Sequence, residues 1–158
     1  MHPQIDALFD EAESRYLKPD ELGLINQFVE SLPERLEAYR VLRDQEVEIM
    51  QLVVDQLEAQ FPHESSSNLE RSIKNALLVM RYCGMGMLVN DETLIKQRLL
   101  SWLCQTIQIY NTQAIDAALY QLLNQRLSQT LTPRQMSFLS PLMTLAQTAL
   151  LERVPMTA

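Results

Sequence analysis

Apolar residues recur at steps of three and four along most of the chain, which is the spacing of one face of an α-helix. The pattern is strongest in residues 69–88, where Leu78 and Val79 widen the apolar face. A helix with such a wide apolar face is expected to be surrounded on more than one side. We therefore expect a central helix here, with any bound ligand lying against it.

The same spacing predicts helices on both sides of this segment. Residues 4–14 form an amphipathic helix too short to stand alone, and Pro19 is suited to the first turn of a second helix, so the two should form a hairpin. Helical spacing continues to about residue 60. An interior proline costs a helix about 3 kcal/mol unless the helix bends, so we expect a kink or short break near Ser31 to Pro33.

Residues 61–68 are the clearest loop. Beyond it we expect Gly84 and Gly86 to bend or end the central helix. Three further helices are predicted, over residues 90–110, 111–127 and 132–151.

Length and composition agree with this pattern. A chain of 158 residues is sufficient for one domain that buries about 70% of its extended surface. It has only three glycines and is 47% hydrophobic, whereas sheets need β-branched runs and turn residues that are scarce here. The predicted fold class is all-α.

Charge and hydropathy exclude several classes of partner. Thirteen basic and twenty acidic residues give a net charge of −7, so nucleic acid, which binds through neutralising cations, is not expected. Polar residues interrupt the two uncharged runs at 99–115 and 135–151, so we expect no transmembrane segment. The N-terminus lacks the basic start and apolar centre of a signal peptide, which favours a cytoplasmic location.

The sequence gives no support for catalysis or metal binding. It contains no nucleophile elbow, Gly-rich phosphate loop or Cys-His pair at a useful spacing. His63 lies in the loop without a second converging ligand, and we interpret it as an exposed histidine. We expect a non-enzyme, with no catalytic residue and no metal site.

The central segment resembles the pigment helix of phycobiliproteins, the bilin-carrying subunits of phycobilisomes. In that family the helix opens with Cys-x-Arg-Asp and ends in a segment such as Tyr-Cys. Aligning Tyr82 and Cys83 places the motif on Leu69-Glu70-Arg71-Ser72, where only the arginine is kept. The resemblance runs from Tyr16 to about Leu151, through Leu36-Glu37-Ala38 and Phe61-Pro62.

This resemblance implies an all-α, globin-like body with a projecting N-terminal helical hairpin. The chain then forms one domain, with residues 1–30 as the hairpin and 31–158 as the body. Residues 44–48 would mark a junction between two helices, as in the family.

The departures from the motif concern the pigment. A bilin is attached by a cysteine thiolate, and Leu69 has no nucleophilic atom. Ser72 offers a neutral hydroxyl where the family has a carboxylate for the pyrrole nitrogens. Arg71, which in the family pairs with a bilin propionate, is retained. We expect no covalent bilin, and Arg71, Ser72 and Cys83 are candidates for non-covalent contacts only.

Cys83 and Cys104 are the only cysteines, and each lies in a helical apolar pattern. We interpret them as two buried thiols in a reducing compartment. The alternatives are a disulfide between them or a bilin on Cys104.

Phycobiliproteins use the N-terminal hairpin to hold a partner subunit in a dimer. Carried over, this implies an interface made by Ile5, Leu8, Phe9, Tyr16 and Leu17. The alternative is that Ile5, Leu8 and Phe9 pack on their own core.

The resulting hypothesis is a pigment-free phycobilisome protein that acts through protein–protein contacts in assembly, regulation or structure. Its partners would be phycobiliprotein subunits or a second copy, in the cytoplasm and peripheral to the thylakoid membrane through phycobilisomes. One alternative is a carrier or sensor that binds a bilin or another tetrapyrrole non-covalently. Another is a globin-like regulatory domain from a different branch.

Overall fold

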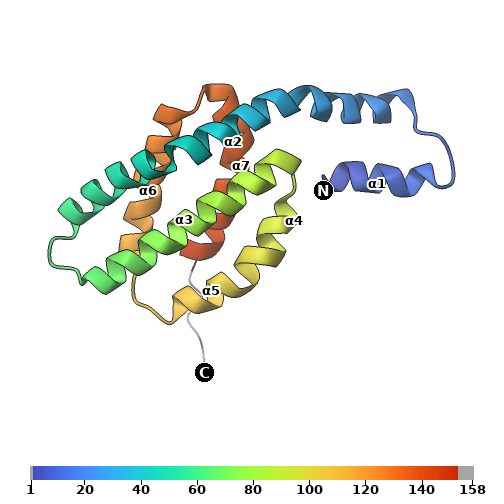
Figure 1. Cartoon of the computed structure of the whole chain (residues 1–158). Helices are drawn as coiled ribbons and strands as arrows, with labels where there is room; N and C mark the ends of the chain where they lie inside the picture. The colour runs from blue at the N-terminus through green and yellow to red at the C-terminus, as the bar shows by residue number, and fades with distance from the viewer. Residues whose placement is uncertain (1, 153–158) are drawn as a thin grey trace.

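The computed structural model describes residues 2–152, and within them the regular structure is entirely helical (Figure 1). The elements in chain order are α1 (Pro3–Ala12), α2 (Pro19–Gln60), α3 (Ser66–Val89), α4 (Glu92–Ile95), the π-helical turn η1 (Lys96–Leu100), α5 (Ser101–Gln108), α6 (Gln113–Thr130) and α7 (Pro133–Leu151). The predicted all-α class is confirmed. No helix in the described part is long and apolar enough to cross a bilayer.

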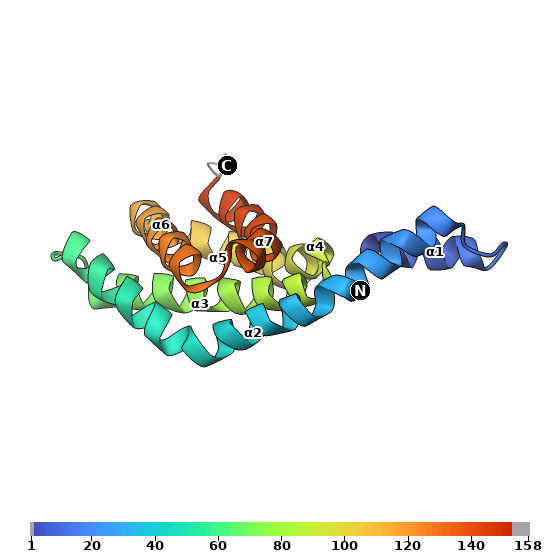
Figure 2. The same ribbon diagram turned by 90° about the horizontal axis from the view of Figure 1, so that it is seen from above.

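The body is built on two layers. Helices α2 and α3 lie side by side, and α6 and α7 pack on one side of this pair (Figure 2). Between the layers lies one core of side chains with almost no solvent exposure, among them Ile49, Leu57, Met80, Met87, Ile95, Leu99, Leu103, Leu119, Leu123, Leu127, Leu139 and Met143. The segment α4–η1–α5 closes one edge.

The prediction near Ser31 to Pro33 was a kink or a short break, and the break is wrong, because α2 is unbroken over its 42 residues. The helix instead curves around the body (Figure 2). Pro33 is on the exposed side of the helix, whereas Ser31, Arg35 and Ala38 are buried on the other. We attribute the continuity to this packing, which holds the flanking turns in place. The helix junction expected at residues 44–48 is also wrong, because α2 continues through them. The boundary drawn at residue 30 between hairpin and body falls inside the same helix.

Helix α3 is the central helix, in contact with α2, α4, α6 and α7. Gly84 and Gly86 do not end it, contrary to the prediction; it runs to Val89 and ends at Asn90, whose φ of 50° is left-handed. Gly86 instead permits a close approach. A Cβ there would lie 3.1 Å from the Asp91 carbonyl oxygen and 3.2 Å from Cδ1 of Ile95.

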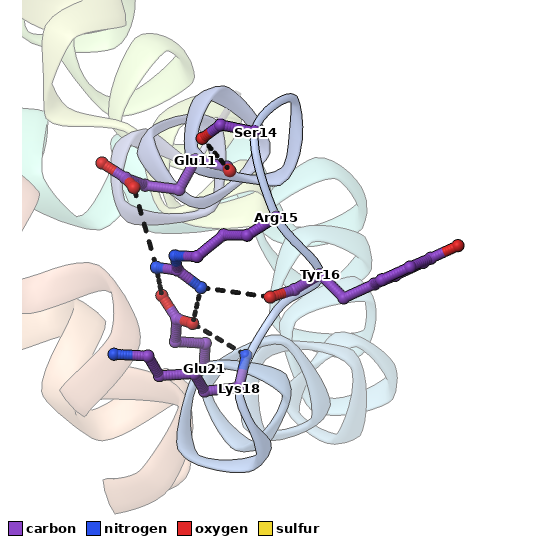
Figure 3. A network of polar contacts seen from close by, with 6 residues as sticks. All are labelled: Glu11, Ser14, Arg15, Tyr16, Lys18 and Glu21. Carbon is purple, nitrogen blue, oxygen red and sulfur yellow. Dashed lines mark hydrogen bonds and ion pairs between the residues drawn. The ribbon is translucent and has the colours of Figure 1, made fainter.

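Helix α1 lies beside the start of α2, and the pair projects from the body as a hairpin (Figures 1 and 2). At the far end, Arg15 forms two hydrogen bonds with Glu21, of 2.8 and 3.1 Å, and Glu21 also accepts from the Lys18 backbone N–H (Figure 3). The hydrogen bonds from Arg15 are the main reason that the pKa of Glu21 falls to about 2. At the near end, His2 reaches the body beside Asn90.

Candidate functional site

The pigment-site residues inferred from the sequence lie at the start of α3. Leu69 is buried and presents no reactive atom. Arg71 donates a hydrogen bond of 3.0 Å to Oδ1 of Asn68, and its guanidinium carbon lies 3.6 Å from the centre of the Tyr110 ring. Ser72 is only 3% exposed, and its hydroxyl has no hydrogen-bond partner. The arginine is thus held by an aromatic ring, and the serine leaves a buried polar atom unpaired.

The two cysteines lie in different environments. Cys83 is fully buried in the core, and this burial raises the pKa of its thiol to about 12, so it remains protonated at neutral pH. Cys104 is half-buried, and burial also raises its pKa. Only a thiolate adds to a bilin. Both cysteines are free, so the alternative of a disulfide between them is wrong. Leu69 and the buried Cys83 do not fit a covalent bilin, and a bilin on Cys104 stays an alternative.

The best-formed pocket lies elsewhere, between α2 and α3. It has a volume of about 280 Å³, and Tyr39, Met80 and Met85 give it an apolar lining. Across it, Arg81 forms a two-bond ion pair with Glu46, with distances of 2.7 and 3.0 Å.

A row of solvent-accessible apolar side chains runs along α2 toward this pocket. Leu22, Val29 and Leu36 are 52%, 52% and 44% exposed, at intervals of seven residues. Half-buried apolar residues occupy the position three after each of them. This is the a and d spacing of a coiled-coil seam. We call these six residues the α2 seam: Leu22, Ile25, Val29, Leu32, Leu36 and Tyr39.

The sequence analysis did not predict the α2 seam, because it noted helical spacing up to about residue 60 without separating the faces of this helix. A signal for the α2 seam was present in the sequence. Residues 22–39 carry apolar positions at three-four steps on more than one face. The other apolar face of α2 packs on the body through Ala38, Leu42 and Ile49.

The five predicted interface residues have different environments. Phe9 is 49% exposed and Tyr16 is 98% exposed, so both are accessible to another molecule. Leu8 and Leu17 are half-buried. Ile5 is 6% exposed, so it is covered by its own chain, which agrees with the alternative stated for this residue.

Comparison with protein families gives one match. The family model described as phycobilisome protein matches residues 9–150, which is most of the chain. The chain belongs to the phycobilisome protein family. No curated protein matches it.

Membership of the phycobilisome family agrees with the helical architecture. Proteins of this family are subunits that assemble with one another. Phycobiliproteins harvest light and are not enzymes. In the alignment made from the sequence, the positions that attach and tune the pigment fall on Leu69 and Ser72, and their lack of a role with a pigment stays a prediction.

Proposed function

We propose that this phycobilisome-family protein carries no pigment and acts by binding other proteins, in the assembly, regulation or structure of phycobilisomes. Its partner would be a phycobiliprotein subunit or a second copy of the chain. It would then work in the cytoplasm, at phycobilisomes on the thylakoid surface. The observation that carries this proposal is the α2 seam, an accessible apolar row on a helix that already packs on the body through another face.

The chemistry of the α2 seam favours a helical partner. Two helices pair along an a/d seam because each apolar side chain enters a space between four side chains of the other. Burial of apolar surface contributes about 25 cal/mol per Å². Monomeric proteins rarely leave a large continuous apolar row exposed, so such a row on a projecting helix supports an interface.

Charge narrows the class of partner. Residues 2–30 contain seven acidic and only two basic side chains. A partner that lies along the hairpin therefore gains from basic residues beside its apolar stripe, and a strongly acidic partner is disfavoured. The second half of α2 has such residues, Arg40 and Arg43, so an antiparallel second copy meets this requirement in part.

The test measures association of the purified protein with itself and with purified phycobiliprotein subunits, by analytical ultracentrifugation. A seam variant with Leu22→Glu and Val29→Glu is expected to bind at least tenfold more weakly. The matched control is Ile109→Glu, because Ile109 is 75% exposed but lies after α5, away from the α2 seam. Phe9→Glu tests the hairpin surface separately. An α2 seam variant that associates as the unchanged protein does would refute this interface.

A second candidate function is non-covalent binding of a bilin or another tetrapyrrole. The observation in its favour is the buried, unpaired Ser72 hydroxyl next to the retained Arg71. Adding phycocyanobilin and recording the absorption spectrum tests it. A red-shifted band that survives dialysis and is lost in Ser72→Ala would support a carrier. A spectrum equal to that of free bilin would remove this candidate.

A further inference from the structure

A second cavity lies where the hairpin meets the body, and it has no connection with the pigment position or the α2 seam. Its volume is about 240 Å³. Its lining includes the polar residues His2, Gln4, Gln27, Ser31, Arg35 and Asn90, and no carboxylate among the described residues. The cavity is therefore bordered by a cation and neutral polar groups.

Arg35 is a buried cation with neutral partners only. It is 8% exposed; its Nε donates to Oγ of Ser31 at 2.8 Å, and its Nη1 donates to the Met87 carbonyl at 2.6 Å. Its guanidinium carbon lies 4.3 Å from the centre of the Phe138 ring. Within residues 2–152 its Nη2 has no hydrogen-bond partner and no carboxylate pairs with it. Burying an ion without a counter-charge is costly.

The end of helix α3 compensates this charge in part. Met87 belongs to the last turn of α3, and a helix C-terminus acts as roughly half a negative elementary charge. Aromatic rings add a smaller attraction. The positive charge is therefore only partly balanced, on a side chain that lines an open cavity.

His2 lies beside this cation and also lines the cavity. It is 5% exposed, and its Nε2 lies 3.1 Å from the Asn90 side-chain nitrogen. An amide nitrogen can only donate, so Nε2 accepts and the neutral ring carries its proton on Nδ1. Nδ1 is buried and has no hydrogen-bond partner among residues 2–152. A buried N–H without an acceptor costs about 1 to 3 kcal/mol.

We propose that this cavity binds a carboxylate, with the Arg35 guanidinium as its donor and the His2 ring beside it. A planar guanidinium matches the geometry of a carboxylate, and hydrogen bonds between charged groups are the stronger ones. The carboxylate belongs either to a small free acid or to a polypeptide. This site goes beyond the proposed function and does not depend on it.

Binding should be coupled to protonation of His2. The charged groups that affect this ring are Arg35 of α2, which opposes its protonation, and Asp6 of α1 and Asp91, which favour it. Asp91 is already engaged as the cap of α4, where it accepts from the Thr93 N–H. A bound carboxylate adds a negative charge beside the ring, so His2 should hold its proton to higher pH in the complex.

The experiment follows the His2 ring by NMR while sodium acetate is added, with sodium chloride at matched ionic strength as reference. Acetate should give saturable shifts and raise the pH at which His2 titrates; chloride should give neither. Arg35→Gln should weaken binding at least tenfold. If Arg35→Gln does not fold, Arg35→Lys replaces it in the test, because lysine keeps the charge but lacks the planar pair of donors. The control is Arg43→Gln, since Arg43 is exposed and paired with Asp44.

Two peptides, acetyl-Gly-Glu-amide and acetyl-Gly-Gln-amide, distinguish the sources. Tighter binding of the glutamate peptide than of acetate assigns the site to a polypeptide carboxylate, and the reverse order assigns it to a free acid. Equal shifts with acetate and chloride, or an unchanged acetate affinity in Arg35→Gln or Arg35→Lys, would overturn the proposal. The same titration on the Leu22→Glu, Val29→Glu protein shows whether carboxylate binding is independent of the α2 seam.

Discussion

Arg71 lies over the ring of Tyr110, with its guanidinium carbon 3.6 Å from the ring centre. Arg71 is in the second turn of α3 and Tyr110 follows α5, so the pair joins the central helix to the edge of the body. In the phycobilisome family the corresponding arginine is a contact for a pigment propionate. Here its face is covered by an aromatic residue of the same chain, and the contact connects α3 with the segment that follows α5.

Replacing Tyr110 tests this contact. Tyr110→Leu removes the cation–π contact and should lower the free energy of unfolding by about 0.5 to 2 kcal/mol. Urea denaturation followed by circular dichroism measures the change. Tyr16→Leu is the control, because Tyr16 is 98% exposed and should change stability by less than about 0.5 kcal/mol. A Tyr110→Leu protein as stable as the control would show that the stacking contributes nothing.

His2 makes docking of the hairpin sensitive to acid. Burial, and then the charge of Arg35, lower the pKa of His2 below its usual 6.5. The folded state therefore binds the proton less readily than the unfolded state does. Stability from the docked ring is present above pH 6.5 and is lost as the pH falls through that value to the folded pKa.

Hydrogen exchange measures this effect locally. Amides of α1 should exchange faster at about pH 5 than at about pH 7.5, after correction for intrinsic rates. In His2→Gln this pH dependence should be absent, because glutamine does not titrate. Equal protection of α1 at both pH values in the unchanged protein would contradict the prediction.

Replacing Gly23 in α2 and Gly86 in α3 by alanine should change the stability of the protein in opposite directions. A Cβ at Gly86 would meet the Asp91 carbonyl oxygen at 3.1 Å, so Gly86→Ala should destabilise the protein by about 1 to 3 kcal/mol. Gly23 lies within α2 with nothing within 4 Å of an added Cβ, so Gly23→Ala should stabilise by about 0.5 to 1 kcal/mol. Chemical denaturation measures both, and effects of the same sign would refute the packing argument.

The two cysteines should differ in their rates of modification. The fully buried Cys83, with its thiol pKa raised to about 12, should react with a thiol reagent only when the protein unfolds. Cys104 is half-buried and should react first in the native state. Mass spectrometry after limited treatment with iodoacetamide identifies the modified residue. Native-state modification of Cys83 as fast as that of Cys104 would show that the core opens readily.

The helical fold could be predicted because helix periodicity is a local property that any window of the sequence displays. The errors came at Pro33, Gly84 and Gly86, residues whose effect depends on their surroundings. Packing of Ser31 and Arg35 on the body holds α2 together across Pro33. The turn at Asp91 approaches Gly86 closely, because glycine has no Cβ. These contacts link residues far apart in the chain, so no local pattern reports them.

The candidate sites were only partly predictable, for the same reason. The sequence placed Arg71 and Ser72 together because they are neighbours, but it gave no sign that Tyr110 would cover the arginine. Spacing indicated that Ile5 and Phe9 are apolar on one helix, and the tertiary structure made one buried and the other exposed.

The sequence by itself determined the chemistry that is missing: residue 69 is leucine, so no thiolate can attach a pigment there. It also determined which residues share a helix face, because that depends only on the geometry of 3.6 residues per turn. The tertiary structure decided which face is covered. Helix α2 has two apolar faces, and only the packing of the body shows that the α2 seam is left accessible and that Arg35 and His2, 33 positions apart, border one cavity.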